Sequence, residues 1–341
     1  MADGKVVSGL TGCGRYREES CYIVGLDARS GEELWRTSTI ALPGQRGGDS
    51  WGDLPPMFRA GSDSWIPGSY DPVSRTLFHG TSQAKPWARA VRGTDGDALY
   101  TNSTLALDPD TGEMKWYYQH LPGETLDMDE VFERVLVDYD DRRSVFTMGK
   151  IAVLWEMALE TGRFRNAHDL GYQTFAEVDS NTGAVRYREG MIPELNKEVF
   201  WCPSTAGFKS WRAMSYYPEL ETFYIPINLN CETAIFGPVE RVEGGAIDIG
   251  FAILKNHQAG CMAALVLCRH IHPVVAIRAG VHPGFRKLGL GDFPAGDAEL
   301  FLRVGMVRIF FLLCEGAWRE QRAGDDELGQ CRKVFHAPQG R

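Results

Sequence analysis

A ten-residue pattern occurs twice in the chain, and it constrains the fold more than any other feature. The two copies are LDARSGEELW, over residues 26–35, and LDPDTGEMKW, over residues 107–116. Both fit L-D-x-x-[ST]-G-E-x-x-W, with every fixed position at the same offset. Two weaker copies keep the acid and the Thr-Gly turn, at residues 158–164 and 178–183. Four copies of one turn indicate a repeat architecture rather than coincidental hairpins.

The pattern has a physical interpretation as a β-hairpin. An Asp side chain can accept hydrogen bonds from backbone amides in the turn, and Gly adopts a positive φ without steric cost. The Trp that follows is large enough to wedge between adjacent sheets. Small sheets that repeat and pack through such wedges form a β-propeller, so the sequence predicts an all-β fold of this type. Helix is expected only in a short stretch near Leu126–Val137.

The composition is that of an ordinary globular protein. Of the 341 residues, 44% are hydrophobic and 24% are charged, which rules out a disordered or collagen-like chain. The 36 Lys and Arg residues against 45 Asp and Glu give a net charge of −9, so nucleic-acid binding is not expected. The apolar runs fall far short of the roughly 20 residues that a transmembrane helix needs, so no membrane span is expected.

The character of the chain changes near residue 249. The Asp-x-x-Thr-Gly turns stop there, and segments such as 261–269 are apolar without clear alternation. We therefore divide the chain into a propeller part, residues 1–248, and a C-terminal segment, residues 249–341. That segment can be a divergent end, a separate small element, or a stretch whose reading frame no longer matches the ancestral coding sequence. The last interpretation is the one we favour.

Eight cysteines and no C-x-x-C argue against a zinc ribbon or a thioredoxin-like dithiol. Two early pairs of cysteines lie at the ends of strand-like stretches, which suits disulfides in an oxidising compartment. Buried free thiols are the alternative, and spacing alone does not choose between them. One soft-ligand cluster, made of Cys261, Cys268, His270 and His272, has a spacing that fits no usual zinc template.

Taken together, several motifs resemble those of the quinoprotein alcohol dehydrogenases, eight-bladed propellers that use pyrroloquinoline quinone (PQQ). The motifs are the repeated turn, GTSQAKPW at residues 80–87, the run at 123–134 and Cys-Pro-Ser at 202–204. The resemblance extends from about Lys5 to about Gly245, which has room for four or five of the eight blades. It implies oxidation of a small alcohol to an aldehyde or ketone, a cytochrome c-type electron acceptor, and a periplasmic location.

The resemblance also assigns roles to individual residues. Trp65 fits the indole that forms the floor under the flat quinone, and Asp127 fits the catalytic base that takes the alcohol proton. Lys150 fits the cationic residue that contacts the quinone carbonyls and stabilises the negative charge that develops there. Ser210 and Trp211 occupy a stretch that approaches the quinone, at a place where the family commonly has an Asn.

Each of these residues also has an ordinary structural interpretation. Trp65 can be one more wedge between blades, because Trp already recurs in this fold. Asp127 can belong to an exposed acidic helix start, together with Asp129 and Glu130. Lys150 follows a Gly, as many solvated turn residues do.

The metal ligands implied by the resemblance are Asp127, Asp129 and Gln83. The family holds calcium with a Glu, an Asn and the catalytic Asp, but the Glu position falls near Gly14, which has no carboxylate. Gln83 stands where the Asn is expected and keeps a carbonyl donor on a longer arm. Asp129, two residues after Asp127, resembles the additional Asp of the lanthanide-using branch. The expected cofactors are therefore PQQ and either Ca²⁺ or a lanthanide ion.

The resemblance implies two disulfides, Cys202–Cys231 and Cys13–Cys21. It also leaves an alternative function open, a non-catalytic propeller that acts as a binding platform and needs neither Asp127 nor a metal. An open propeller of four or five blades exposes sheet edges and interblade faces. The chain alone is accordingly expected to bind the quinone weakly or not at all.

Overall fold

The structure is a computed structural model of the chain. It describes residues 1–14, 16–17, 21–245 and 249–258, and the backbone of four further strands. These strands are β21 (Ala263–Cys268), β22 (Val274–Ile277), β23 (Leu300–Val304) and β24 (Val307–Phe311).

The first part of the chain forms three antiparallel sheets, each built from strands that follow one another. In sheet order the strands are β1 (Lys5–Gly9), β2 (Tyr22–Asp27) and β3 (Glu33–Ser38), then β5 (Ser69–Asp71), β6 (Thr76–Gly80), β8 (Ser103–Leu107) and β9 (Met114–Gln119), then β10 (Val135–Tyr139), β11 (Arg142–Met148), β12 (Val153–Ala158) and β13 (Phe164–Asp169). The repeated turns join β2 to β3, β8 to β9 and β12 to β13, at the same place in each sheet.

The later sheets are less regular. They pair β14 (Ala176–Val178) with β15 (Val185–Tyr187), β16 (Glu198–Trp201) with β19 (Asn230–Phe236) and β20 (Phe251–Gln258), β17 (Ser215–Tyr217) with β18 (Thr222–Ile227) and β21, and β22 with β24 and β23. A short pair joins β4 (Ala60–Gly61) to β7 (Ala84–Lys85). The described helices are α1 (Arg89–Arg92) and the 3₁₀ turns η1 (Gly48–Trp51), η2 (Pro56–Phe58) and η3 (Pro218–Leu220).

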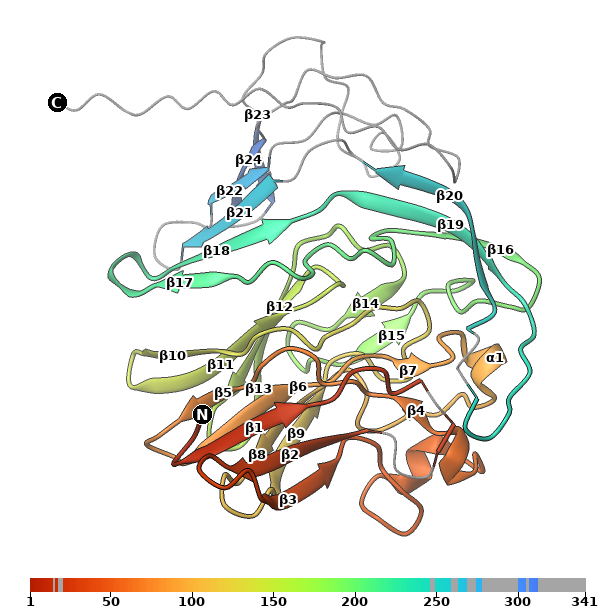
Figure 1. Cartoon of the computed structure of the whole chain (residues 1–341). Coiled ribbons are helices and arrows are strands. Elements are labelled where there is room, and N and C mark those ends of the chain that lie inside the picture. Colours follow the sequence, from red (N-terminus) through yellow and green to blue (C-terminus); the bar gives the residue numbers. More distant parts are fainter. Residues whose placement is uncertain are drawn as a thin grey trace, which may run out of the picture.

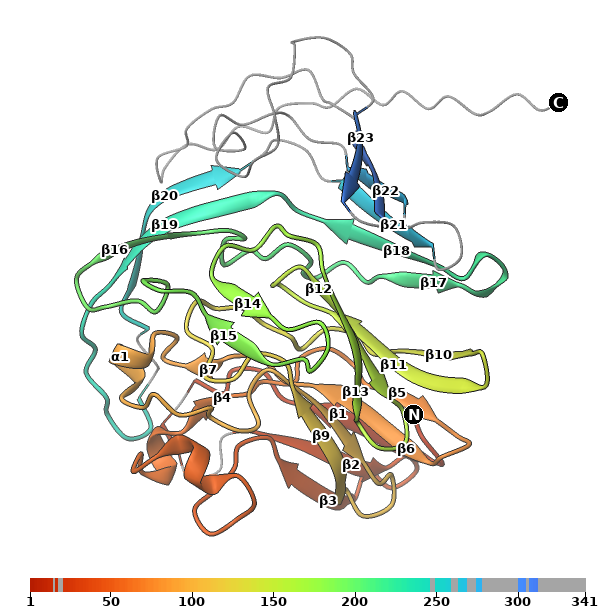
Figure 2. The ribbon, with the colours of Figure 1, turned by 180° about the vertical axis from the view of Figure 1, so that it is seen from behind.

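The sheets follow one another in chain order as the blades of a propeller. Figure 1 shows the series from β1–β3 through β10–β13 to β19 and β20, and Figure 2 shows the same series from behind. The all-β propeller predicted from the sequence is therefore confirmed. Because β20 pairs with β19 and β21 with β18, strands on both sides of residue 249 share sheets. The division of the chain at that point stays a prediction.

The repeated turn is closed by its Asp. Asp27 Oδ1 accepts hydrogen bonds from the amides of Arg29 and Ser30, at 2.9 and 2.8 Å. Asp108 makes the equivalent pair of bonds in the second copy of the turn, and Asp179 does so in a weaker copy. An Asp that caps its own turn in this way stabilises the hairpin without help from the rest of the fold.

The Trp of each strong copy of the pattern docks its blade on the next one. Trp35 Nε1 donates a hydrogen bond to the carbonyl of Pro109 at 3.0 Å. Trp116 Nε1 donates to the carbonyl of Leu159 at 3.1 Å. Both indoles are buried, and the acceptor in each case belongs to the following blade's turn. The pattern therefore links neighbouring blades through a buried indole and its hydrogen bond, which explains why it recurs.

The glycine of each receiving turn makes room for the docked indole. A Cβ on Gly112 would collide with the Trp35 ring, and a Cβ on Gly162 would collide with the Trp116 ring. Both glycines also have a positive φ, 72° and 66°, which other residues adopt only at a cost. Turn conformation and blade packing therefore require the same residue at the same position.

The predicted helix near Leu126–Val137 is wrong. That segment is irregular through Arg134, and β10 begins at Val135. Asp127 has a φ of 64°, outside the helical region. Its acidic residues resemble a helix start in sequence, but in the structure they are buried against partners from other blades, and these tertiary contacts decide the backbone.

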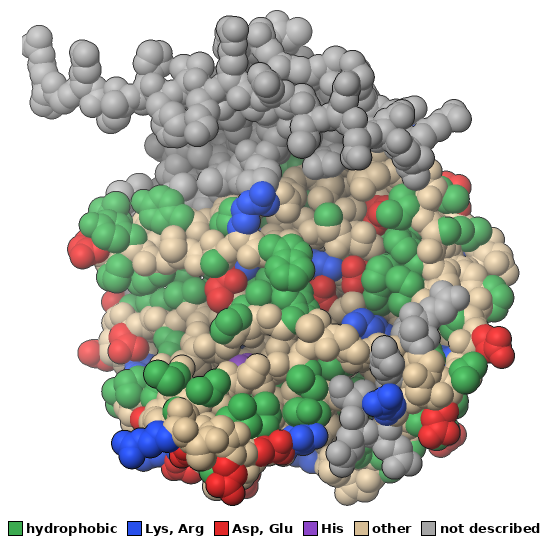
Figure 3. Space-filling model, viewed as in Figure 1, with side chains coloured by type: hydrophobic (Ala, Val, Ile, Leu, Met, Phe, Trp, Pro, Cys, Tyr) green, Lys and Arg blue, Asp and Glu red, His purple; other side chains and the backbone are tan. Residues whose placement is uncertain are grey.

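Figure 3 shows acidic and basic side chains interspersed over the described part of the face seen in Figure 1. Ion pairs such as Lys5–Asp110 and Arg75–Asp3 join them across neighbouring blades. Among the described residues, no helix has the length and apolarity that crossing a membrane requires.

Candidate active site

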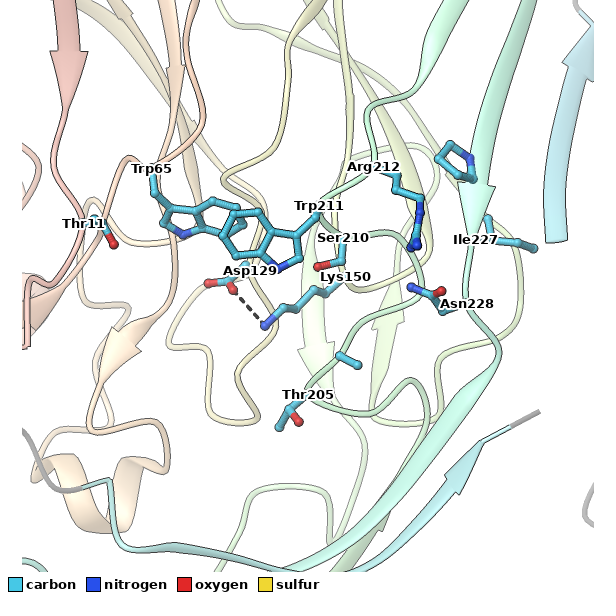
Figure 4. A pocket seen from close by; sticks show the side chains of 12 residues that line it. Thr11, Trp65, Asp129, Lys150, Thr205, Ser210, Trp211, Arg212, Ile227 and Asn228 are labelled. Carbon is cyan, nitrogen blue, oxygen red and sulfur yellow. Dashed lines mark ion pairs between the residues drawn. The ribbon is translucent and has the colours of Figure 1, made fainter. Parts of the chain in front are cut away.

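A cavity of about 440 Å³ opens where loops from successive blades converge. Trp65 comes from the loop between β4 and β5, Asp129 from the loop before β10, and Lys150 from the loop between β11 and β12. Figure 4 shows these side chains turned toward one another. The lining residues are Thr11, Trp65, Asp129, Lys150, Thr205, Ala206, Ser210, Trp211, Arg212, Pro226, Ile227 and Asn228.

A buried ion cluster lies at the cavity wall. Lys150 Nζ is 2.9 Å from Asp127 Oδ2 and 2.8 Å from Asp129 Oδ2. It also donates a hydrogen bond to the backbone carbonyl of Asp127, at 2.8 Å. All three residues are buried, with 6%, 7% and 5% of the surface of Lys150, Asp127 and Asp129 exposed. A single ammonium therefore joins two carboxylates in a place that excludes most water.

Gln83 completes this cluster. Its Nε2 donates a hydrogen bond to Asp127 Oδ1 at 2.6 Å, and its backbone amide donates to Asp129 Oδ1 at 3.2 Å. Its side-chain carbonyl oxygen, Oε1, is buried and accepts no hydrogen bond from the described residues. A buried acceptor without a partner is costly, so this oxygen is available to a ligand.

The environment shifts the pKa values of the cluster. Burial raises the pKa of the Asp127 carboxyl well above its ordinary value, against the opposing effect of the Lys150 ammonium. Burial also disfavours the charged form of Lys150, but Asp127 and Asp129 outweigh it and raise the pKa of that amine. Lys150 is therefore held as an ammonium, and the acids compete for a limited amount of compensating charge.

Two glycines let the loops approach closely enough to build the cluster. A Cβ on Gly149 would collide with the backbone carbonyl of Asp129, which accepts a hydrogen bond from the Lys150 amide at 2.9 Å. A Cβ on Gly207 would collide with the side chain of Lys150. These small residues pack the backbone of one blade directly against the functional side chains of another.

Aromatic rings form the other side of the cavity. The Trp65 ring centre is 4.4 Å from that of Trp211, with an angle of 38° between the planes. Phe132 presents its edge to Trp65, with the centroids 5.3 Å apart. Trp65 is partly buried, whereas Trp211 is 75% exposed. The flat face of Trp65 is thus covered by a ring with few contacts of its own.

The structure brings the predicted residues together. Gln83, Asp127, Asp129 and Lys150 form one hydrogen-bonded cluster, while Trp65, Ser210 and Trp211 line the same cavity as Asp129 and Lys150. The exposed acidic helix start considered for Asp127 and the solvated turn considered for Lys150 are wrong, because both side chains are buried. The roles assigned to these residues stay predictions.

Sequence reasoning missed several lining residues. Arg212 lies beside Trp211 but was not singled out, although its place next to an assigned residue was a usable signal. Thr205 was not missed in the same way, because it lies directly after the Cys-Pro-Ser motif, in the stretch that the family resemblance placed at the cofactor side. Asn228 follows β18 and reaches the cavity only through the blade's geometry. No local pattern marks it.

The structure contains both disulfides that the resemblance implied, Cys13–Cys21 and Cys202–Cys231. Asp63 lies beside the first pair and accepts a hydrogen bond from the Cys13 amide at 2.9 Å. With both sulfurs bonded to each other, this group does not offer thiolate ligands to a metal. The soft-ligand cluster at Cys261, Cys268, His270 and His272 lies outside the residues whose side chains are described.

Comparison with known proteins agrees with the propeller fold. Residues 2–164 match the family model described as the β-propeller domain of glucose, ethanol and alcohol dehydrogenases that use PQQ. The quinohemoprotein alcohol dehydrogenase ADH IIB of Pseudomonas putida is 32% identical over 242 residues, which cover 66% of this chain and 35% of the relative. Lupanine 17-hydroxylase [cytochrome c] of a Pseudomonas species is 30% identical over 256 residues, with 67% and 35% covered.

Solved structures share the fold. The quinohemoprotein alcohol dehydrogenase ADHIIG from Pseudomonas putida matches with a TM-score of 0.68 at 23% identity, over 79% of this chain and 43% of that one. A europium-containing methanol dehydrogenase matches with a TM-score of 0.66 at 19% identity, over 79% and 48%.

The fold and the matches define the class as a quinoprotein-type β-propeller. Over the matched residues, the chain resembles the PQQ-dependent alcohol dehydrogenases. It spans about a third of the length of the two curated relatives described above.

Proposed function

We propose that the protein is a PQQ-dependent alcohol dehydrogenase that oxidises a small alcohol to an aldehyde or ketone. The observation that carries the proposal is the buried contact of Asp127 with Lys150, at 2.9 Å, in a cluster that shares its cavity with the indole of Trp65. An acid, an amine and a flat aromatic face are the groups that this chemistry uses.

The donor set fits a hard metal ion. Asp127 and Asp129 offer carboxylate oxygens, and Gln83 offers a buried carbonyl oxygen that accepts no hydrogen bond from the described residues. Calcium and related cations prefer several oxygen ligands of these kinds. Gly14 supplies no carboxylate where the family has one. Metal binding by side chains therefore depends on Asp127, Asp129 and Gln83. We assign Asp127, Asp129 and Gln83 as the ligands of Ca²⁺ or a lanthanide ion.

The cavity also fits a flat anionic cofactor. Trp65 offers a planar face for stacking, and Lys150 and Ser210 offer polar groups at its border. A ring that stacks on Trp65 must take the place of the Trp211 indole, whose 75% exposure leaves it able to move aside. Its new position beside the bound ring would account for the cofactor-binding role assigned to Trp211.

The residues of the chain then act on the alcohol in a defined way. When bound, the quinone supplies the acceptor for the hydride of the carbinol carbon, and the metal ion supplies a Lewis acid beside it. Asp127 accepts the proton of the alcohol hydroxyl. Lys150 holds a fixed positive charge next to Asp127, where it stabilises developing negative charge. Burial of the cluster strengthens these interactions because little water screens them.

Two further expectations belong to this proposal. Electrons leave to a cytochrome c-type acceptor, in keeping with the names of the relatives, which include quinohemoproteins and a cytochrome c-linked hydroxylase. The protein acts in the periplasm, and the two disulfides support this because they persist in an oxidising compartment.

Reconstitution tests the function. The purified protein is incubated with PQQ and Ca²⁺, and separately with PQQ and a lanthanide, and the reduction of an artificial electron-acceptor dye by primary and secondary alcohols is followed. We expect alcohol-dependent dye reduction in at least one of the two. Dye reduction that persists unchanged in Asp127→Ala, or a lack of alcohol-dependent reduction under both conditions, would contradict the assignment.

A non-catalytic binding platform is the second candidate function. The observation that favours it is the weakened ligand set, with Gly14 in place of a carboxylate and Gln83 in place of an Asn. A protein that takes up neither quinone nor metal, yet folds and keeps its docking turns, would support this alternative.

A further inference from the structure

Lys209 is a fully buried lysine beside the cavity, with 0% of its side chain exposed. Its Nζ lies 2.6 Å from Glu133 Oε1 and 2.7 Å from Glu133 Oε2. Removing an ammonium from water is costly unless it is paired. The structure therefore places this charge inside the protein, where its direct ion pair with Glu133 compensates it.

Glu133 holds the chain at two points. Besides pairing with Lys209, its Oε1 accepts a hydrogen bond from the backbone amide of Met214 at 2.7 Å. The residues between these two anchors include Ser210, Trp211 and Arg212, which line the cavity. One carboxylate thus ties down both ends of the segment that forms a wall of the candidate site.

The same ammonium also supports the floor of the cavity. Lys209 Nζ lies 4.4 Å from the centre of the Phe132 ring, in a cation–π contact. Phe132 in turn presents its edge to Trp65. Phe132 and Glu133 are neighbours in the loop that also carries Asp127 and Asp129. Lys209 therefore contacts the loop that carries Asp127 and Asp129, and through Phe132 it supports Trp65, as well as belonging to the segment that forms the cavity wall.

We propose that Lys209 is a positioning residue, which holds the 210–212 segment against Trp65 through its ion pair with Glu133 and its contact with Phe132. It touches neither substrate nor cofactor. Its effect is to set the separation between the wall that carries Trp211 and the floor formed by Trp65. The consequence for quinone binding rests on the proposed function, whereas the placement of the two indoles does not.

The test uses the far-ultraviolet exciton couplet that two indoles in close contact produce in circular dichroism. Trp65 and Trp211, 4.4 Å apart, are the pair expected to give this signal. We expect Lys209→Met, which removes the charge and keeps the length, to lose the couplet while retaining cooperative unfolding. Trp211→Phe identifies the signal, because it removes one of the two indoles and leaves Lys209 in place.

Glu133→Gln provides a nearly isosteric second variant if Lys209→Met fails to fold. We expect it to lose the couplet as well, and the double variant to show no further loss, because both changes break one pair. Asp71→Asn is the matched control, since it breaks the Arg143–Asp71 pair outside the cavity and should destabilise the protein without altering the couplet.

Titration with PQQ adds a second measurement. The quinone must displace the Trp211 indole from Trp65, and Lys209 holds the segment that carries this indole against Trp65. The dissociation constant should therefore fall in Lys209→Met and Glu133→Gln and stay unchanged in Asp71→Asn. A couplet and quinone affinity equal to those of the unmodified protein in Glu133→Gln would overturn the proposal. A lost couplet in a protein that never binds quinone would uphold the positioning role and contradict the proposed function alone.

Discussion

The ammonium of Lys150 lies between the carboxylates of Asp127 and Asp129, 2.9 Å from the first and 2.8 Å from the second. The two acids belong to one loop and the lysine to the next blade, so the contact joins two blades at the cavity. The same Asp127 carboxylate also receives a hydrogen bond from Gln83, a residue of a third loop. The candidate site is therefore a product of the propeller's assembly, in which each blade brings one part.

Replacing Asp127 by Asn tests its role as a base. Asn tolerates the positive φ of 64° that residue 127 adopts, so the backbone should be kept. We expect alcohol-dependent dye reduction by the reconstituted protein to fall about 10²- to 10⁴-fold, the usual effect of losing a general base. Quinone uptake should change little. Equal activity in Asp127→Asn and the unmodified protein would remove Asp127 from the mechanism.

Asp129 is expected to decide whether a lanthanide binds. Terbium bound near the cavity should emit when Trp65 or Trp211 is excited, so its luminescence reports occupancy without any turnover. We expect Asp129→Ala to weaken terbium binding at least about tenfold, because it removes one of the few oxygen ligands. Glu160→Gln, an exposed acid on a docking turn, is the control. Similar terbium binding by both variants would exclude Asp129 as a ligand.

Two glycines at equivalent positions separate turn strain from blade packing. Gly31 and Gly112 both have a positive φ, 75° and 72°, but only at Gly112 would a Cβ collide with an indole, that of Trp35. Gly31→Ala should cost about 1–2 kcal/mol of unfolding free energy from backbone strain alone. Gly112→Ala should cost about 1–3 kcal/mol more, because its Cβ would also overpack the contact with the docked Trp35 indole. Urea unfolding measures both free energies. Equal losses of stability in the two variants would contradict the docking of Trp35 on the turn at Gly112.

Buried histidines predict a loss of stability in acid. Burial lowers the pKa of His79 to about 4, helped by the nearby Arg134 guanidinium. The unfolded chain takes up this proton near its ordinary pKa of about 6.5, well before the folded protein does. Stability is thus complete above about pH 6.5 and falls toward pH 4 by about 1.4 kcal/mol per pH unit.

His79→Gln should flatten this pH dependence, as seen in urea midpoints measured between pH 7 and pH 5. His120, whose pKa burial also lowers, should keep a residual slope in that variant. An unchanged slope in His79→Gln would show that other groups control the acid sensitivity.

The docking turns show what the sequence alone could predict. The Asp, Gly and Trp of L-D-x-x-[ST]-G-E-x-x-W each have a local task, so their chemistry could be inferred from the order of residues. The carbonyls that receive Trp35 and Trp116, those of Pro109 and Leu159, could not. Hydrogen bonds to the next blade depend on blade spacing, which no short pattern encodes.

The residues of the site also divide into those that the sequence identifies and those that only the structure brings together. Asp127 and Lys150 were found through family motifs, although 23 positions separate them. Lys209 and Glu133 lie 76 positions apart, and no pattern in the sequence links the two, so their pairing appears only in three dimensions. The erroneous helix near Leu126–Val137 has a related cause, because acids that face distant partners look in sequence like a helix start.

The central claim is most directly tested by titrating the purified protein with PQQ in the presence of Ca²⁺ or a lanthanide, with tryptophan fluorescence as the signal. The account predicts weak but saturable quenching by one equivalent of quinone, with an affinity lowered about tenfold or more in Trp65→Ala and Lys150→Met. Quenching that never saturates, or that is the same in both variants as in the unmodified protein, would contradict it.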